Sequence, residues 1–355
     1  MENKELNQKL RYLIGLLAVI PLAIVLLLGL LVAQMLGLRI NVDIYWKETA
    51  NTANNSVVVT KPAEAKASLP TLWQAPDTST IPQDEQGKLI RYGRELIKNT
   101  SAYLGKNGSV AKMSNDMNCQ NCHLEAGTKP FGNNYSAVAS TYPKFRERSG
   151  TVETIPKRVN DCLERSLNGK PLDTASREMQ AIVEYIHWLG KDVKKEEKPA
   201  GAGILELAYM DRAASPEKGK IVYEKKCFSC HQLDGSGVPD TEKGGYQYPP
   251  LWGKNSYNNG AGLFRLSRFA GYVKANMPLG ASYNSPLLTD EEAWDIAAYV
   301  NSMPRPDVRK TVMKNDWKNI AGKPIDHPFA PFADGFSEEQ HKFGNFKPII
   351  AARKK

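Results

Sequence analysis

The chain has 355 residues, which is enough for two or three domains, each with its own hydrophobic core. Its formal net charge of +9 raises the question of a nucleic-acid partner. The lysines and arginines are scattered and no nucleic-acid-binding motif is present, so we exclude that class and expect attraction to small anions or to an acidic protein.

The first apolar segment, Leu13 to Ala33, contains no charged residue and continues to Leu38. As a helix it is long enough to span the hydrocarbon core of a membrane. A cleaved signal peptide is the alternative, but the residues before Ala33 make a poor cleavage site. We therefore expect residues 12–38 to form one transmembrane helix.

Basic residues precede this segment. Lys4, Lys9 and Arg11 favour a cytoplasmic N-terminus, residues 1–11, and a translocated remainder. The rest of the chain is then expected on the periplasmic, outer side of the cytoplasmic membrane. Residues 39–80 are rich in Thr, Asn, Ala and Pro, a composition typical of a linker.

One cofactor motif then occurs twice. The order C-x-x-C-H is found at Cys119, Cys122 and His123 and again at Cys227, Cys230 and His231. This is the attachment signature of a c-type haem, in which two cysteines form thioethers and the histidine binds the iron. Zinc also binds C-x-x-C pairs, but a histidine directly after both pairs favours haem. We predict two covalently bound c-type haems.

A helical pattern accompanies each motif. The first copy opens with GKLIRYGRELI and closes with SREMQAIVEYIHWLG, and the second opens with GKIVYEK and closes with TDEEAWDIAAYVNSMPRP, where Thr289 and Glu292 fit a capping box. Residues 191–203, charged and then rich in Pro and Gly, are typical of a linker. We expect an all-α protein with two haem domains in tandem, residues 81–195 and 196–306, and a tail, residues 307–355, packed on them.

The ligand on the far side of each iron distinguishes the two domains. In the second domain, Met277 is the only methionine between His231 and the closing helix. Ligation by Met and His gives a comparatively high potential, which suits electron transfer. A core methionine is the alternative. We predict that Met277 is the ligand.

The first domain has no methionine in the corresponding region. Cys162 stands there instead, at nearly the same distance from the closing helix. His187 is a rival ligand, although it lies in the closing helix itself, and a buried free cysteine is the simpler alternative. A thiolate ligand lowers the potential of the iron and places a sulfur nucleophile beside an electron acceptor. We therefore predict Cys162 as iron ligand and expect sulfur chemistry.

Cationic residues surround Cys162 in the sequence. They are Arg158 and Arg165 on either side, Lys144, Arg146 and Arg148 upstream, and Lys129 after the first haem motif. Ser166 lies one helical turn beyond Cys162 if the segment is helical. Such residues are usually solvated, but several on one haem face would bind a dianion through the forked geometry of arginine.

From about residue 70 to the end, the chain resembles the dihaem c-type thiosulfate dehydrogenases, which also act as tetrathionate reductases. The matching segments are CQNCHLEAGTKPFG, YPKFRERSGTVETIPKRVNDCLERSLNGKPL, PPLWGKNSYNNGAGLFR and KPIDHPFAPFADGFSEEQHKFG. The resemblance implies two class I cytochrome c domains. It also implies a His123/Cys162 haem at the active site and a His231/Met277 haem as the electron exit.

The same resemblance implies that Arg148, Arg165 and Ser166 contact the substrate with Cys162; Lys129 and Arg146 are further candidates for binding. The chain departs from the family in two ways. The family is often soluble, whereas this chain is expected to be anchored. Some members have a lysine immediately before the distal methionine that exchanges with it, but here Asn276 stands there. We expect Met277 in both redox states, with Lys274 as the open alternative.

The expected reaction joins two thiosulfates into tetrathionate and releases two electrons, with Cys162 as covalent nucleophile. The electrons would pass to another c-type cytochrome or to a respiratory complex. The competing hypothesis is a membrane-anchored dihaem cytochrome that only shuttles electrons to or from such a complex. A dihaem peroxidase is a third alternative, for which the sequence offers no peroxide site.

Overall fold

The structure is a computed structural model and describes residues 71–354. The predicted transmembrane helix, residues 12–38, lies outside the described residues. Among residues 71–354, no helix is both long enough and apolar enough to cross a membrane. The helices are α2 (Glu85–Lys98), α3 (Thr100–Leu104), α4 (Leu124–Gly127), α5 (Val138–Thr141), α6 (Ile155–Arg165), α7 (Arg177–Leu189), α8 (Pro216–Lys226), α9 (Phe228–His231), α10 (Leu266–Asn276), α11 (Asp290–Ser302), α12 (Glu338–Phe343) and α13 (Lys347–Arg353), and the strands are β1 (Lys144–Arg146), β2 (Thr151–Glu153), β3 (Val238–Pro239) and β4 (Tyr246–Tyr248).

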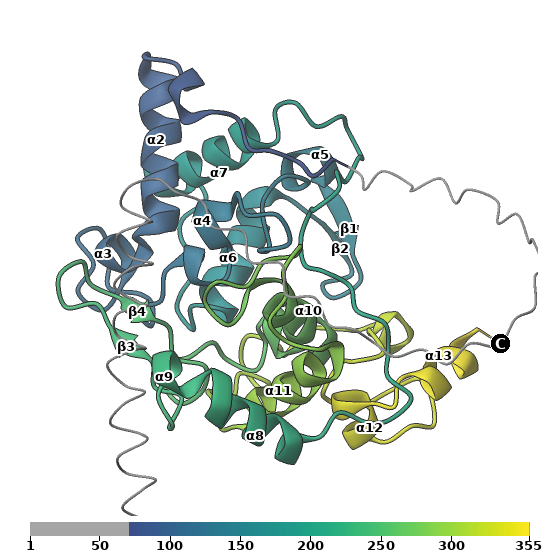
Figure 1. Ribbon diagram of the computed structural model, residues 1–355. Helices are drawn as coiled ribbons and strands as arrows, with labels where there is room; N and C mark the ends of the chain where they lie inside the picture. The colour runs from purple at the N-terminus through teal and green to yellow at the C-terminus, as the bar shows by residue number, and fades with distance from the viewer. Residues whose placement is uncertain (1–70, 355) are drawn as a thin grey trace, which may run out of the picture. The chain divides into compact units, whose positions relative to one another are not determined.

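Each domain is built on one pair of crossed helices (Figure 1). In the first domain α2 packs against α7, and in the second α8 packs against α11 with α10 beside it. Each crossing has a glycine where the two helices meet. A Cβ added at Gly93 would lie 1.9 Å from the Ala181 carbonyl oxygen, and one added at Gly219 would lie 1.9 Å from the Asp295 carbonyl oxygen, so neither position has room for a side chain. In both domains the closing helix thus packs on the opening helix, and the two domains share one architecture.

Side-chain caps fix where these helices begin. Before α2, Asp84 Oδ1 accepts a hydrogen bond from the Gly87 N–H at 2.9 Å. Before α11, Thr289 and Glu292 each accept a hydrogen bond from the other's backbone N–H, which confirms the predicted capping box. These interactions connect residues three positions apart, so the starts of the helices can be predicted from the sequence.

Apolar cores lie inside both helix pairs. Leu96 and Tyr185 are fully buried in the first, and Tyr223 and Trp294 are almost fully buried in the second. A smaller cluster lies beneath α6 and consists of Leu104, Met117, Leu163 and Leu167. Because Leu163 follows Cys162 directly, this cluster anchors the turn of α6 that carries Cys162.

Two short hairpins correct the purely α-helical expectation. β1 and β2 pair antiparallel, with Phe145 opposite Val152, and β3 pairs with β4. Alternation along β1 and β2 leaves Phe145 and Val152 exposed and turns Glu153 inward, where it is buried. A strand of three residues is too short for a period of two to be recognised in the sequence. The first hairpin matters for the site because its turn carries Arg148.

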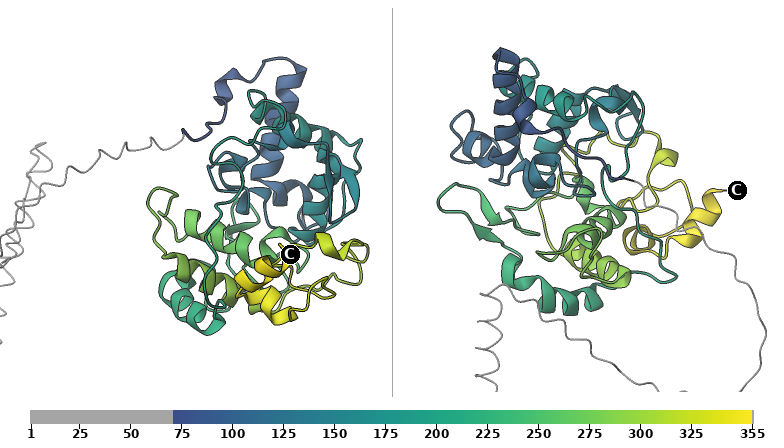
Figure 2. Two further views of the ribbon diagram at one scale, coloured as in Figure 1. Left: turned by 90° about the vertical axis from the view of Figure 1, so that its right-hand side faces the viewer. Right: turned by 45° about the horizontal axis from the view of Figure 1, so that its top comes forward.

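The two domains lie side by side (Figure 2) and contact each other through their haem-binding segments. Tyr272 of α10 donates its hydroxyl hydrogen to the carbonyl oxygen of Asn121, between the first two cysteines, at 3.0 Å. Asn276, next to Met277, donates from Nδ2 to the Phe131 carbonyl oxygen at 3.1 Å. These bonds fix the two candidate haem sites relative to each other.

The segment after α11 packs on both domains and is coloured yellow towards its end in Figures 1 and 2. Phe346 and Ile349 enter the core of the second domain. Closer to α11, the Trp317 N–H donates to the Arg148 carbonyl oxygen of the first domain at 2.7 Å. The tail therefore links the second domain to the hairpin of the first.

Candidate functional site

The second C-x-x-C-H motif opens onto a cavity of about 770 Å³. The cavity is lined by all four residues predicted for the second haem: Cys227, Cys230, His231 and Met277. His231 Nδ1 lies 2.8 Å from the Pro249 carbonyl oxygen, to which it can donate, and burial lowers the pKa of this histidine. A neutral imidazole held through Nδ1 keeps Nε2 free to bind a metal. These residues fit a c-type haem, and Met277 directly follows the end of α10.

The same cavity reaches the first haem motif, since Asn118, Asn121 and Cys122 also line it. Tyr272 borders it as well and is buried. Burial raises the pKa of Tyr272, and a negative charge on Cys122 raises it further. Because such an interaction acts over a short range, the side chains of Tyr272 and Cys122 lie near each other. Cys122 of the first motif and the three attachment residues of the second thus adjoin one shared space.

The first motif is held from several sides. The Cys119 N–H donates to Thr100 Oγ1 at 2.9 Å, His123 Nδ1 lies 2.5 Å from the Asn133 carbonyl oxygen, and the imidazole stacks on Tyr135 at 4.5 Å between ring centroids. Burial lowers the pKa of His123 to about 4. The histidine is therefore neutral at ordinary pH, as an iron ligand has to be. The first motif also fits a c-type haem.

Cys162 lies in the last turn of α6, and its carbonyl oxygen accepts from the Ser166 N–H at 2.8 Å. Burial raises the pKa of the Cys122 thiol to about 12, and a charge on Cys162 contributes to that shift. Cys162 is therefore close to the first haem motif, as the prediction of iron ligation requires. His187, by contrast, is exposed and lines a separate cavity of about 350 Å³.

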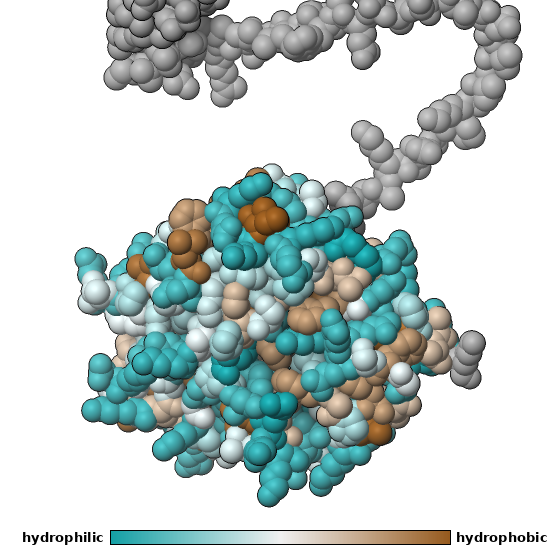
Figure 3. Space-filling model, turned by 90° about the horizontal axis from the view of Figure 1, so that it is seen from below, coloured by the Kyte–Doolittle hydropathy of each residue, from teal (hydrophilic) through white to brown (hydrophobic). Residues whose placement is uncertain are grey.

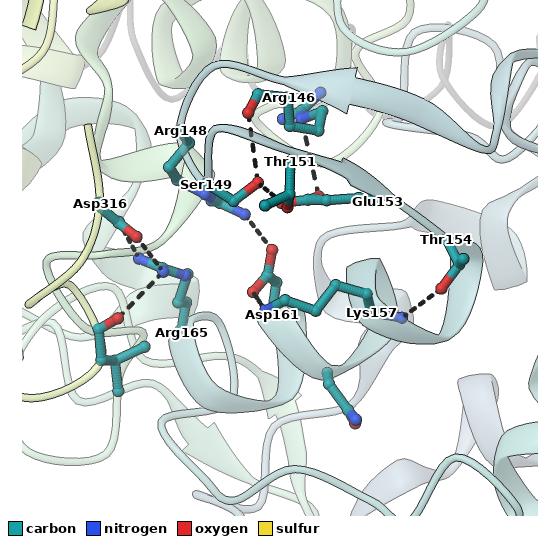
Figure 4. Close-up of polar contacts among 12 residues, drawn as sticks. Arg146, Arg148, Ser149, Thr151, Glu153, Thr154, Lys157, Asp161, Arg165 and Asp316 are labelled. Atoms are coloured by element: carbon teal, nitrogen blue, oxygen red, sulfur yellow. Dashed lines mark hydrogen bonds and ion pairs between the residues drawn. The ribbon is translucent and has the colours of Figure 1, made fainter. Parts of the chain in front are cut away.

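The two arginines expected to contact the substrate are both paired with aspartates (Figure 4). Arg148 Nη2 binds Asp161, which also accepts from Lys157 Nζ at 2.8 Å. Arg165 forms a forked ion pair with Asp316, at 2.8 Å through Nη1 and 2.9 Å through Nη2. Much of the positive charge that the sequence places around Cys162 is thus balanced by carboxylates.

The remaining candidates, Arg146, Ser166 and Lys129, lie in three separate segments. Arg146 Nε is 3.9 Å from the buried carboxylate of Glu153, across the hairpin. Ser166 caps the end of α6 beside Cys162. Lys129 lies in the turn after α4 and is partly buried, with its carbonyl oxygen accepting from the Gly132 N–H at 2.9 Å. No hydrogen bond between Lys129 and α6 occurs among residues 71–354.

Arg158 interacts electrostatically with both predicted ligands of the first haem. It precedes Cys162 by one turn of α6, and the charge of a Cys162 thiolate is the main cause that raises the pKa of Arg158. Its own charge helps to lower the pKa of His123, so it acts on both predicted ligands of the first haem. Within residues 71–354, its guanidinium has no ion pair with a carboxylate. From the sequence Arg158 is one of several flanking cations; its four-residue spacing predicts that it lies beside Cys162 on a helix, but Arg165 at three residues fits that position equally.

Comparisons with known proteins identify both domains. Residues 109–194 match the family model described as SoxA/TsdA, cytochrome c domain, and residues 216–304 match cytochrome c. These matches confirm the predicted tandem of cytochrome c domains and, with it, the two c-type haems.

Similar whole proteins were also found. The chain is 35% identical over 275 residues to a thiosulfate dehydrogenase of Psychrobacter arcticus, covering 77% of this chain and 80% of that protein. It is 36% identical over 235 residues to a thiosulfate dehydrogenase of Allochromatium vinosum, covering 65% and 83%. The solved structure of thiosulfate dehydrogenase (TsdBA) from Marichromatium purpuratum, in the as-isolated form, is similar with a TM-score of 0.61 and 30% identity. That match covers 66% of this chain and 50% of the Marichromatium chain.

Proposed function

This chain belongs to the thiosulfate dehydrogenase family and is an oxidoreductase with two c-type haems, and from that premise we propose that it interconverts thiosulfate and tetrathionate. In the oxidative direction two thiosulfate dianions give one tetrathionate dianion and two electrons. When bound, the haems supply one-electron acceptors for this chemistry. The observation that carries the proposal is the placement of Cys162 and Arg158 one turn apart on α6, close to the first haem motif.

Cys162 and His123 would hold the iron of the first haem, and Cys162 would also be the nucleophile of the reaction. Its Sγ forms a bond to the outer sulfur of one thiosulfate, and two electrons leave, so that a thiosulfonate anion is attached to the cysteine. The outer sulfur of a second thiosulfate then attacks the outer sulfur of this adduct. Tetrathionate departs and the Cys162 thiolate is restored, so atoms and charges balance without a proton being transferred.

Repulsion between the dianions is the main electrostatic obstacle to this reaction. Arg158 has no ion pair with a carboxylate in the described part of the chain, and a Cys162 thiolate stabilises its charge more than the nearby Asp161 and Glu153 do. Arg148 attracts the substrate anion more weakly, because its ion pair with Asp161 partly neutralises its charge. Ser166, at the end of the same helix, has a hydroxyl group that can donate to an anion. We therefore assign the first contact with the substrate to Arg158, with Arg148 and Ser166 in support.

His231 and Met277 would hold the second haem, which would supply the route by which electrons leave. Support comes from the shared cavity that adjoins both motifs. Apolar side chains also stand exposed beside this haem site: Phe228 lies between its cysteines and Leu279 follows Met277 by two residues. Patches of apolar surface interrupt an otherwise hydrophilic face in Figure 3. Another c-type cytochrome or a respiratory complex is the partner that we assign to the second haem.

Membrane anchoring is part of the proposal and rests on the apolar segment in residues 12–38. The haem domains then lie on the periplasmic side of the cytoplasmic membrane, where c-type haem is attached.

The test is tetrathionate formation by the purified full chain, with ferricyanide as acceptor and thiosulfate as donor. The reverse reaction is followed with tetrathionate and a reduced viologen dye. The Cys162→Ala variant controls for reactions of haem alone, because it retains both attachment motifs. Electron exchange with a carrier but no turnover in either direction would establish the shuttle hypothesis instead.

A further inference from the structure

The segment after the second domain forms a strap, residues 308–322, across the first domain. Its Asp316 carboxylate binds both terminal nitrogens of Arg165, and Arg165 Nη2 also donates to the Val312 carbonyl oxygen at 3.3 Å. The next residue, Trp317, donates its N–H to the Arg148 carbonyl oxygen at 2.7 Å. The strap therefore contacts both α6, three residues after Cys162, and the turn of the first hairpin (Figure 4).

Arg165 has little freedom in this arrangement. Its side chain is 6% exposed and that of Asp316 is 11% exposed. The backbone of Arg165 is fixed as well, because its carbonyl oxygen accepts from the Asn258 N–H of the second domain at 3.1 Å. Arg165 Nε has no partner among the described residues, but it is fully buried. A dissolved dianion cannot reach this guanidinium unless the ion pair opens.

We infer that Arg165 and Asp316 form a clasp that positions the active site, and that Arg165 does not contact the substrate. A forked arginine–carboxylate pair is directional, so it fixes the strap as well as neutralising the charge. The strap in turn holds the backbone of Arg148, and Asn319 Nδ2 reaches Glu147 Oε2 in the same turn at 3.4 Å. Asp316 is thus a positioning residue that acts through Arg165 and the Arg148 turn. This inference rests on the proposed function for its effect on catalysis.

The Asp316→Asn variant separates the two roles of Arg165, because they predict opposite signs. If Arg165 contacted thiosulfate, removing its competing carboxylate would strengthen binding and lower the KM. If it forms a clasp, a buried charge loses its partner, the Arg148 turn loosens, and the KM rises by about tenfold with a smaller change in kcat. Asp316→Glu, which keeps the carboxylate, should restore part of the loss.

A second variant distinguishes loss of the clasp from general misfolding of the protein. Replacing a buried ion pair by apolar side chains of similar size is often neutral for stability. The double variant Arg165→Met, Asp316→Leu should therefore keep the strap in place and keep the KM within about threefold of the wild type. A large loss of thiosulfate affinity in the double variant, with the strap still in place, would overturn the inference.

The position of the strap is measured independently of activity by hydrogen–deuterium exchange of peptides covering residues 146–150 and 311–322. We expect faster exchange in Asp316→Asn and wild-type protection in the double variant. Lys347→Gln is the matched control, since Lys347 pairs with Asp211 at an exposed site of the same tail. Unchanged exchange in Asp316→Asn would refute the clasp. Absence of thiosulfate turnover in the wild type would refute the proposed function, while the exchange experiment would still decide on the clasp.

Discussion

Replacing Arg158 by Gln tests the assignment of the substrate contact most directly. The variant keeps the length of the side chain approximately but removes its charge from beside Cys162. A hydrogen bond to a charged group contributes about 1.5–3 kcal/mol. If that contribution is realised with thiosulfate, kcat/KM should fall roughly 10- to 150-fold. Arg158 has no carboxylate partner within residues 71–354, so none is left unpaired by the change.

Lys157→Gln is the matched control for this experiment. It removes the same charge from the adjacent residue of α6, but Lys157 is 52% exposed and pairs with Asp161. We expect a change of less than about threefold, because exposed ion pairs contribute little. Initial rates with ferricyanide give kcat/KM, and the absorption spectrum checks both haems. An equal loss in both variants would show that only the overall positive potential matters, and no loss in Arg158→Gln would refute the assignment.

Further predictions concern the nucleophile, the fold and the anchor. Cys162→Met should keep both haems and raise the potential of the first, as seen by redox titration, because an anionic ligand is replaced by a neutral one; normal thiosulfate turnover in this variant would defeat the covalent mechanism. Gly219→Ala should destabilise the second domain by about 1–3 kcal/mol, measured by denaturant unfolding, since the new Cβ meets a backbone carbonyl. Burial alone would raise the pKa of Asp326. The charge of Arg265 and the hydrogen bonds from Arg265 and Ser267 outweigh this effect, so the pKa of Asp326 lies below the ordinary 3.8. This carboxylate therefore stabilises the fold above that pH and less so as the pH falls below it, so the stability difference between wild type and Asp326→Asn should shrink in acid. Removal of residues 1–38 should release the protein from membranes without detergent; a detergent requirement that persists would contradict the anchor.

The elements that sequence predicts well are those whose determinants are local. The helices α2, α7, α8 and α11 have apolar periodicity and capping residues within a few positions of their ends. The haem attachment motifs are contiguous, and their chemistry depends on spacing alone. For these helices and motifs, the order of residue types is sufficient to predict where they lie in the chain, and the structure adds how they pack.

The roles of the arginines could not be predicted in the same way. Arg158 and Arg165 lie four residues before and three residues after Cys162, so a helix brings both to the side of Cys162. The difference between them comes from Asp316, which neutralises Arg165 from a segment 151 residues away. Nothing in the local sequence indicates this pairing. The resemblance to a family implied Arg148, Arg165 and Ser166 as substrate contacts, and that expectation stays a prediction which the Arg158 and Asp316 variants test.

The clasp has a consequence for how the protein is made. Translation proceeds from the N-terminus, so the segment carrying Asp316 leaves the ribosome only after both C-x-x-C-H motifs and α11 have been synthesised. A chain interrupted after the second domain would contain every residue needed to attach two haems but would lack the carboxylate that holds Arg165. If the clasp positions the site as inferred, this positioning part is synthesised after the haem-attachment motifs, and incomplete chains would reach haem attachment without it.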